Sequence, residues 1–276
     1  MLVEKVFPRD SLRYAVFQKD IKTAGDFIEK FSIIRLFVIW SMTVCGSVLS
    51  AGLEYRFVYW DWADSISGLV RIAISSILFF YILRPNGLWT GGSKRLTSSE
   101  LVSHTLIASA LIIIGAIGTG VDYGRFVLHL VAYSVGFLGA LLIFQFPLKL
   151  DISKGEWVVE TWQNKFNYLG LSSLLFIIAI FSGFYLDDPI LSTVAMVNLP
   201  FSIVALIFPD HVRHLQRARF YPLFIFSLFL CVRAPWFLIP LVVLFYSLRT
   251  VNYFRYGITY PSFGVDFDES TLYEDV

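Results

Sequence analysis

Long apolar stretches alternate along the chain with shorter stretches that hold most of its charges, prolines and glycines. An apolar helix needs about 20 residues to cross about 30 Å of hydrocarbon, and only helices satisfy their own backbone in runs of this length. The pattern therefore predicts an all-α fold, a polytopic transmembrane helical bundle. We place eight spans at about residues 32–53, 66–84, 100–120, 125–146, 166–186, 190–208, 219–232 and 234–251. The sequence Thr97-Ser98-Ser99-Glu100 has the form of a capping box and predicts the start of the third span.

The last two spans are the least regular part of the pattern. Residues 219–251 contain Pro222, Arg233, Pro235 and Pro240. A single long span would place Arg233 near the middle of the membrane, at a cost of several kcal/mol. Two short helices that meet at Arg233 and Pro235 avoid this cost, so the sequence favours a helical hairpin.

The lysines and arginines fall mostly on one side of the predicted topology. Of the 22, 18 lie on one side, which comprises the N-terminal stretch, the stretches after spans two, four, six and eight, and the adjoining ends of the spans. Three lie on the opposite side, and Arg71 lies within the second span. Cytoplasmic loops of membrane proteins carry the excess of basic residues. We therefore expect an even number of spans, both termini in the cytoplasm, and a location in a bacterial cytoplasmic (inner) membrane.

Three regions follow from this topology. Residues 1–31 form a cytoplasmic N-terminal segment, in which apolar residues at helical spacing from Leu12 to Phe31 predict an interfacial amphipathic helix. Residues 32–251 form the transmembrane helical bundle. Residues 252–276 form a cytoplasmic acidic tail.

The composition narrows the classes of function. The chain of 276 residues is 57% hydrophobic and 16% charged, and its net charge of +1 does not favour a nucleic-acid partner. Cys45 and Cys231 both lie in apolar runs, which excludes a disulfide framework or a CxxC metal site. The sequence contains no Walker loop, HExxH or GxSxG motif. Whether the protein is an enzyme therefore stays open.

The histidines do not predict a metal or haem site. His104 and His129 lie in adjacent spans at depths that differ by about 20 Å, too far apart to share one metal. His211 and His214 are one helical turn apart, but the arginines around them would repel a divalent ion. We therefore expect no metal and no cofactor.

Basic residues at the cytoplasmic ends of the spans are the main candidates for ligand binding. Such charges suit the anionic head group of a lipid or a diphosphate whose chain lies between helices. The bias of basic residues toward cytoplasmic loops would alone place them there as well. The candidate head-group residues are Arg84, Lys94, Arg95, Lys149, Arg213 and Arg217, with Arg219 beside them.

Asn198 and Pro200 interrupt the sixth span near its middle. Proline frees a backbone carbonyl and a buried asparagine needs partners, and broken helices of this kind line binding cavities in some transporters. A tolerated kink with a satisfied asparagine is the alternative. In the fourth span, Ala132, Gly136 and Ala140 form a ladder of small residues that fits close helix packing or dimerisation.

The end of the fourth span reads Phe144-Gln145-Phe146-Pro147-Leu148-Lys149-Leu150-Asp151. In this motif-like stretch and in the long stretches after spans two, four and six, the chain resembles the UbiA-type intramembrane prenyltransferase superfamily. Members build their site from these loops, and many end the fourth span in a Tyr-Ser…Pro-Pro-x-Arg-x-Lys motif. The resemblance implies that Pro147 and Lys149 match motif residues and that Lys149 lies near a polar head group. The Asp-rich motifs that hold Mg²⁺ in the family are absent, because residues 83–90 contain no aspartate and only Asp210 lies near the end of span six. The chain therefore resembles a divergent member without normal prenyl transfer.

Three function hypotheses follow from these observations. The first is an integral membrane protein that accommodates an isoprenoid or lipid-like ligand, as a degenerate prenyltransferase-like protein, with a membrane lipid or isoprenoid as its partner. The second is a non-catalytic integral subunit or scaffold of a larger membrane complex, which the absence of catalytic motifs favours. The basic residues at the cytoplasmic ends of the spans, together with Asn198 and Pro200, favour the first hypothesis. The third is a solute transporter.

Overall fold

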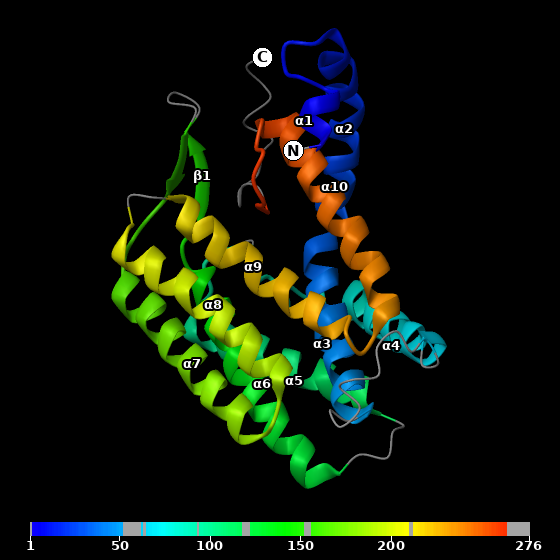
Figure 1. Cartoon of the computed structure of the whole chain (residues 1–276), viewed down its shortest axis with the longest axis vertical. Helices are drawn as coiled ribbons and strands as arrows, with labels where there is room; N and C mark the ends of the chain where they lie inside the picture. The colour runs from blue at the N-terminus through cyan, green and yellow to red at the C-terminus, as the bar shows by residue number, and fades with distance from the viewer. Residues whose placement is uncertain are drawn as a thin grey trace.

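The computed structural model describes residues 2–51, 62, 65–92, 94–117, 122–151, 156–209 and 212–263, and within them the chain is almost entirely helical (Figure 1). In chain order the elements are α1 (Leu2–Val6), α2 (Leu12–Lys30), α3 (Ile33–Ala51), α4 (Ser65–Leu78), the π-helix η1 (Phe79–Leu83), α5 (Ser98–Ala116), α6 (Tyr123–Ile143), β1 (Leu148–Asp151), β2 (Glu156–Val159), α7 (Lys165–Tyr185), α8 (Pro189–Ile207), α9 (Val212–Leu230), the 3₁₀ helix η2 (Pro235–Phe237) and α10 (Leu238–Tyr256).

Seven helices in the described part of the chain are long and apolar enough to cross a membrane. They are α3, α4 with η1, α5, α6, α7, α8, and η2 with α10. Their apolar segments have 18 to 22 residues, which gives about 27–33 Å of helix at 1.5 Å per residue. This length matches the hydrocarbon thickness of a bilayer. The chain is therefore an integral membrane protein with an all-α polytopic fold, as the apolar pattern predicted.

α9 is a further long helix of the bundle. Its 19 residues pack against α8, α3 and α10. Arginines at positions 213, 217 and 219 make its first two turns polar, although its length equals that of its neighbours. The helix begins at Val212 rather than at the predicted 219, because arginine is a good helix former where hydropathy is low.

The predicted break between two helices at the end of the bundle is confirmed, although both are longer than expected, with 19 residues in α9 and 22 in η2 with α10. α9 ends at Leu230, turns through Arg233 and restarts at Pro235. Proline at the first position of η2 fits because that position needs no backbone N–H donor. An even number of crossings and the orientation of the bundle stay predictions.

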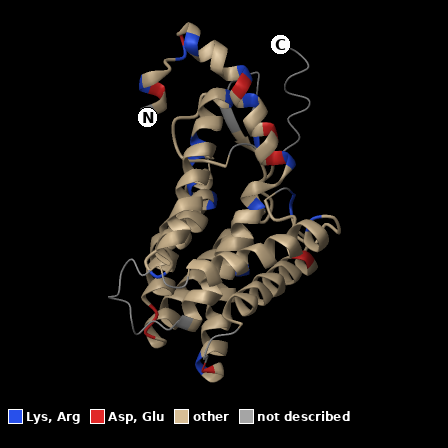
Figure 2. Cartoon of the chain, turned by 90° about the vertical axis from the view of Figure 1, so that its right-hand side faces the viewer, with Lys and Arg blue, Asp and Glu red and all other residues tan. Residues whose placement is uncertain are grey.

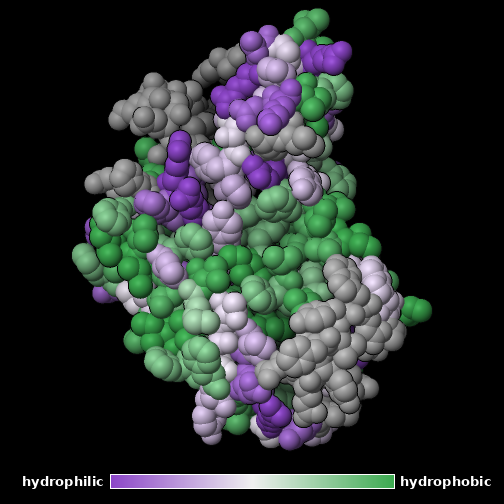
Figure 3. Space-filling model, in the orientation of Figure 1, coloured by the Kyte–Doolittle hydropathy of each residue, from purple (hydrophilic) through white to green (hydrophobic). Residues whose placement is uncertain are grey.

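Apolar side chains cover the outside of the bundle. Figure 3 shows them as a broad band across the middle of the molecule, with hydrophilic residues above and below. Along α4 most exposed side chains are aliphatic, with Ile66, Leu69, Val70, Ile74 and Ile77 all more than half exposed. A contiguous apolar surface of this extent fits contact with lipid rather than with water.

Side-chain caps fix the starts of three bundle helices. The Glu100 backbone N–H donates to the Thr97 hydroxyl (3.3 Å), and the Thr97 backbone N–H donates to the Glu100 carboxylate (2.8 Å). The capping box predicted for this helix is therefore confirmed. Asp122 and Asp188 accept two backbone N–H bonds each at the starts of α6 and α8.

α3 and α5 cross at two glycines. A Cβ atom at Gly46 would lie 1.8 Å from the Ile112 carbonyl oxygen, and one at Gly115 would lie 1.8 Å from the Thr43 carbonyl oxygen. The Ser47 hydroxyl donates across the crossing to the Gly115 carbonyl (3.0 Å). Only glycine permits two helix backbones to approach this closely.

The stretch after α6 contains a β-hairpin that the sequence did not predict. β1 pairs antiparallel with β2, from Leu148 opposite Val159 to Asp151 opposite Glu156. Four residues per strand are too few for the alternation of apolar and polar positions to stand out from a loop.

The amphipathic helix expected at residues 12–31 is present as α2, which lies along the end of α10 (Figure 1). Arg255 of α10 pairs with Asp26 and Glu29 of α2, and the Tyr14 hydroxyl donates to the backbone oxygens of residues 253 and 254. Figure 2 shows that charged residues of both signs gather at this end of the molecule. Contact of α2 with a membrane surface stays a prediction, and residues 264–276 of the expected acidic tail lie outside the described residues.

Candidate functional site: a cavity between the bundle helices

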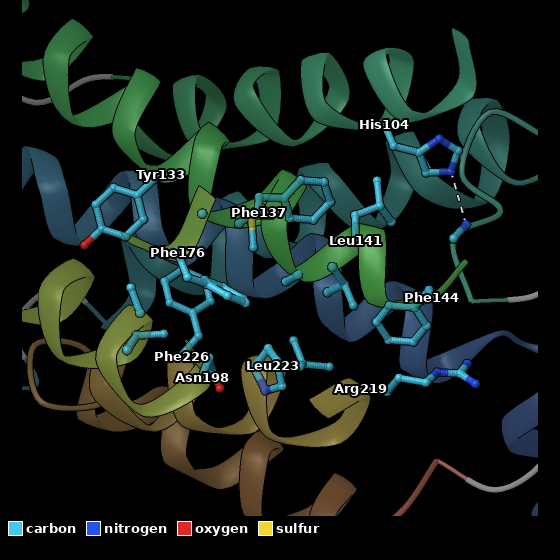
Figure 4. A pocket seen from close by; sticks show the side chains of 18 of the residues that line it. His104, Tyr133, Phe137, Leu141, Phe144, Phe176, Asn198, Arg219, Leu223 and Phe226 are labelled. Atoms are coloured by element: carbon cyan, nitrogen blue, oxygen red, sulfur yellow. Dashed lines mark hydrogen bonds between the residues drawn. The ribbon is translucent and has the colours of Figure 1, made fainter. Parts of the chain in front are cut away.

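Six bundle helices, α3 and α5 to α9, surround a cavity of about 1050 Å³, counted with its open part. Figure 4 shows Arg219, Phe144 and His104 toward one side of the cavity and Tyr133 and Phe176 toward the other. We call the first side the arginine end and the second the tyrosine end.

Two arginines line the arginine end. Arg219, in the second turn of α9, is only 3% exposed, and its guanidinium lies 4.6 Å from the centre of the Phe144 ring. Arg35, in the first turn of α3, donates to the Trp89 carbonyl (3.3 Å) and to the Ser32 hydroxyl (2.6 Å). No aspartate or glutamate lines the cavity in the described part of the chain. The arginine end therefore carries positive charge within its own wall.

The segment between η1 and α5 folds inward and closes part of this end. The Trp89 side chain is 3% exposed and stacks on His104 (ring centroids 5.2 Å apart) and on Phe137 (5.9 Å). The His104 Nε2 atom accepts from the backbone N–H groups of Thr90 (2.8 Å) and Gly91 (3.1 Å). These two donors require an unprotonated Nε2, so Nδ1 carries the proton and donates to the Glu100 carbonyl (2.7 Å). His104 thus fixes the loop to the start of α5.

The middle of the cavity is apolar, and small residues of α6 make room for it. Gly136 and Ala140 both line the cavity. A Cβ atom at Gly136 would have Leu191 (3.6 Å) and Ala179 (3.7 Å) as its nearest neighbours, both at ordinary contact distance. Gly136 and Ala140 of the ladder therefore face the cavity, where α6 packs against α7 and α8 at ordinary distances, whereas α3 and α5 approach more closely at their glycines.

Asn198 lines the cavity near the middle of α8. It is 1% exposed, and neither its Nδ2 nor its Oδ1 atom has a hydrogen-bond partner among the described residues. Figure 4 places it near Leu223 and Phe226 of α9. α8 runs unbroken from Pro189 to Ile207 with Pro200 inside it, which agrees with a tolerated proline and not with a broken helix. The neighbouring helices tolerate the proline without unwinding.

A buried polar cluster lies at the tyrosine end. The Tyr133 hydroxyl donates to the Asp188 Oδ1 atom (3.2 Å), and the Asp188 Oδ2 atom lies 3.7 Å from the His129 Nε2 atom. Asp188 is 1% exposed, and burial raises the pKa of its carboxyl above the ordinary value. The backbone N–H groups of Ile190 and Leu191 also donate to Oδ1 (both 3.0 Å), so the same carboxyl caps α8.

The segment after α10 returns to the arginine end. The Asn252 amide donates to the Ser262 carbonyl (2.7 Å), and Phe263 lines the cavity. The Phe263 ring lies 5.0 Å from Phe220 and 6.3 Å from Phe144, measured between centroids. Phe263 therefore forms part of the wall although it follows the last helix of the bundle.

Of the residues that the sequence proposed as a head-group site, Arg219 lines the cavity and the other six do not. Lys94 pairs with Glu100 and Lys149 pairs with Glu160. The remaining four are Arg84, which donates to the Lys30 carbonyl, Arg95, which lies over Tyr168, Arg213, which lies over Tyr260, and Arg217, which is exposed. These six basic residues therefore lie outside the wall of the cavity.

Sequence reasoning missed Arg35, Trp89, His104 and Phe263 as cavity residues. Arg35 was counted only as a topological charge, and His104 was considered only as a metal ligand. His104 and His129 lie at different ends of the cavity, as their sequence positions implied, while His211 lies outside the described residues. The described residues contain no group of three or more metal-ligating side chains. Trp89 follows Gly87 and precedes Gly91 and Gly92, and this glycine-rich setting was the available signal for an inward-folding loop.

Comparison of the chain with protein-family models, with curated proteins and with solved structures gives no match.

Proposed function

We propose that this protein binds an anionic, lipid-like amphiphile in the cavity, with the anionic group at Arg35 and Arg219 and the hydrocarbon chain toward Phe176 and Leu191. The carrying observation is the combination of two arginines at one end with an apolar wall that contains no acidic residue among the described residues. A guanidinium forms strong, directional bonds with phosphate and carboxylate oxygens. The apolar wall offers a chain the same environment as the surrounding bilayer.

The position of Arg219 supports a bound anion. Its side chain is only 3% exposed and lines the cavity, where little water screens the attraction between a guanidinium and an anion. An anionic head group at this end would also meet Arg35, whose guanidinium donates to the Trp89 carbonyl and to the Ser32 hydroxyl. An isoprenoid phosphate and an acyl lipid both satisfy this requirement.

Two finer hypotheses concern the family and the location of the protein. A relationship to the UbiA-type superfamily is supported by the partial motif at residues 144–151 and by a cavity whose wall includes Trp89 and Gly91 from the loop after span two and Phe144 from the end of span four. A bacterial inner-membrane location is supported by the distribution of lysine and arginine. Catalysis of prenyl transfer is not part of the proposal, because the Asp-rich motifs are absent.

Lipid retention tests the proposal. The protein is purified in a mild detergent, and bound lipid is measured by native mass spectrometry for the wild type, Arg219→Gln and Arg35→Gln. Each substitution removes a charge-assisted hydrogen bond of about 1.5–3 kcal/mol, so lipid binding should weaken by about tenfold or more.

Arg217→Gln is the matched control. This substitution removes the same charge two residues away on α9, where the Arg217 side chain is exposed. Arg217 was also one of the head-group candidates in the sequence. Lipid occupancy should stay unchanged in this variant. If Arg217→Gln reduced occupancy as much as Arg219→Gln, the basic surface rather than the cavity would hold the lipid. A wild type that carries no lipid would leave the scaffold hypothesis ahead.

A blocked cavity gives an independent test. Ala195 lines the cavity and Met196, the next residue of α8, is 41% exposed on the outside. Ala195→Phe should fill the chamber and abolish lipid retention, whereas Met196→Phe should leave it intact. Equal retention in both variants would contradict binding inside the bundle.

A further inference from the structure

We infer that the ligand is a glycerophosphate lipid, in which ester and hydroxyl oxygens lie a few bonds from the phosphate, and that Asn198 recognises this polar region. This inference deepens the proposed function and rests on it. The observation behind it is an almost fully buried carboxamide in the cavity wall whose two polar atoms have no partner among the described residues.

An unsatisfied amide inside a membrane protein destabilises the empty state. Leaving one buried polar group without a partner costs more than the hydrogen bond itself contributes, and the amide has both donors and acceptors. An apolar residue would fill the same space in α8 without this cost. The carboxamide is therefore explained by a ligand that supplies hydrogen-bonding atoms at its depth, which a plain hydrocarbon chain does not.

The depth of Asn198 relative to Arg219 follows from helix geometry. Asn198 lies nine residues before the end of α8 at Ile207, and Arg219 lies seven residues after the start of α9 at Val212. α8 and α9 are antiparallel neighbours (Figure 1). The Cα atom of Asn198 is therefore about 3 Å deeper than that of Arg219, at 1.5 Å per residue.

Side-chain direction increases this separation. Side chains lean toward the N-terminus of their own helix. Arg219 therefore leans toward the arginine end and Asn198 leans toward the tyrosine end. A phosphate held by Arg219 would place the next several atoms of its chain between the two side chains. In a glycerophosphate lipid these atoms carry the glycerol hydroxyl and the ester, whereas in an isoprenyl or alkyl phosphate they are hydrocarbon.

Two single-chain phosphates distinguish these ligand classes. Binding of a 1-acyl lysophosphatidic acid and of an n-alkyl phosphate of matched chain length is measured on delipidated full-length protein in detergent, with farnesyl phosphate as an isoprenoid probe. The wild type should bind the lysophosphatidic acid at least about tenfold more tightly than either of the other probes, because only it offers partners to the carboxamide.

Asn198→Leu, a nearly isosteric apolar substitution, is the deciding variant. It should reduce the preference for lysophosphatidic acid to about one, while the alkyl phosphate binds at least as tightly as to the wild type. Retained binding of the alkyl phosphate also shows that the variant is folded and that the arginine end is intact. Should the variant not fold, the wild-type preference by itself still tests the inference.

The outcomes separate the inference from the proposed function. Equal affinities of the wild type for all three phosphates, each weakened by Arg219→Gln, would overturn the glycerophosphate inference and leave the amphiphile site standing. A preference that persists in Asn198→Leu would assign the recognition to other residues and would also overturn it. If no phosphate probe binds the wild type, both proposals fall.

Discussion

The glycine crossing between α3 and α5 gives a sharp prediction about the stability of the bundle. A Cβ atom at Gly46 or at Gly115 would lie 1.8 Å from a backbone carbonyl of the opposite helix, which is 1.6 Å short of ordinary contact at 3.4 Å. A side chain could rotate away from such an overlap, but a helix backbone cannot. Gly46→Ala and Gly115→Ala should therefore each push the two helices apart.

The expected loss can be estimated from what this movement breaks. Overpacking of a well-packed core costs about 1–3 kcal/mol. Separation of the helices also removes the hydrogen bond from Ser47 to the Gly115 carbonyl, which contributes about 1 kcal/mol. Each variant should lose about 3 kcal/mol of unfolding free energy. The double variant should lose less than twice this amount, because the helices are already apart after the first substitution.

Reversible unfolding by SDS in mixed micelles, followed by circular dichroism, measures these free energies. Gly170→Ala is the control, because a Cβ atom at Gly170 in α7 would meet no atom within 4 Å. This control should be neutral or stabilise by up to about 1 kcal/mol, since alanine is the better helix former. A Gly46→Ala variant within about 0.5 kcal/mol of the wild type would refute the close crossing.

Three further predictions concern the ends of the cavity and the topology. Burial raises the pKa of the Asp188 carboxyl, so the wild type should lose stability relative to Asp188→Asn as the pH rises from below about 4 through the raised pKa. Parallel thermal unfolding of the two proteins from pH 3 to 8 checks this, and a stability difference that does not change with pH would contradict it. Phe263→Ala removes part of the wall at the arginine end and should speed exchange of bound lipid, measured by stopped-flow displacement, whereas an unchanged rate would mean that the segment does not limit access. With both native cysteines buried, an impermeant thiol reagent applied to intact cells should label Tyr123→Cys but label Arg217→Cys only after permeabilisation, and the reverse pattern would overturn the predicted orientation.

Much of the fold was predictable because lipid imposes one dominant requirement on the chain. Every span must be apolar over a fixed length and must satisfy its own backbone, so hydropathy alone located the bundle helices. The Thr97–Glu100 capping box was predictable because its hydrogen bonds are local. The β-hairpin and the true start of α9 were not, since both lie where polar residues mask a regular structure.

The packing of the helices was harder to predict than their existence. The small residues of α6 and the glycines of α3 and α5 obey the same pattern of small side chains. One set widens a cavity and the other brings two backbones together, and the difference depends on which helix faces each set. Phe263 was beyond prediction for a similar reason, because it reaches the cavity only through a reversal of the chain after α10.

Arg217 and Arg219 show why the ligand-binding residues could not be separated from the topological charges in the sequence. Both belong to the same basic cluster and serve the positive-inside bias equally well. At 3.6 residues per turn, two positions apart means a rotation of about 200° around α9, so the two side chains must point to nearly opposite faces. One face of α9 packs into the bundle and the other does not, and the chain alone does not say which is which. Once the fold makes Arg219 the buried one, its guanidinium lies in the wall of the cavity, which Arg35 and Asn198 also line. Two arginines and an amide without a partner among the described residues then share one apolar wall, and this combination favours a ligand that carries both an anionic group and further hydrogen-bonding atoms.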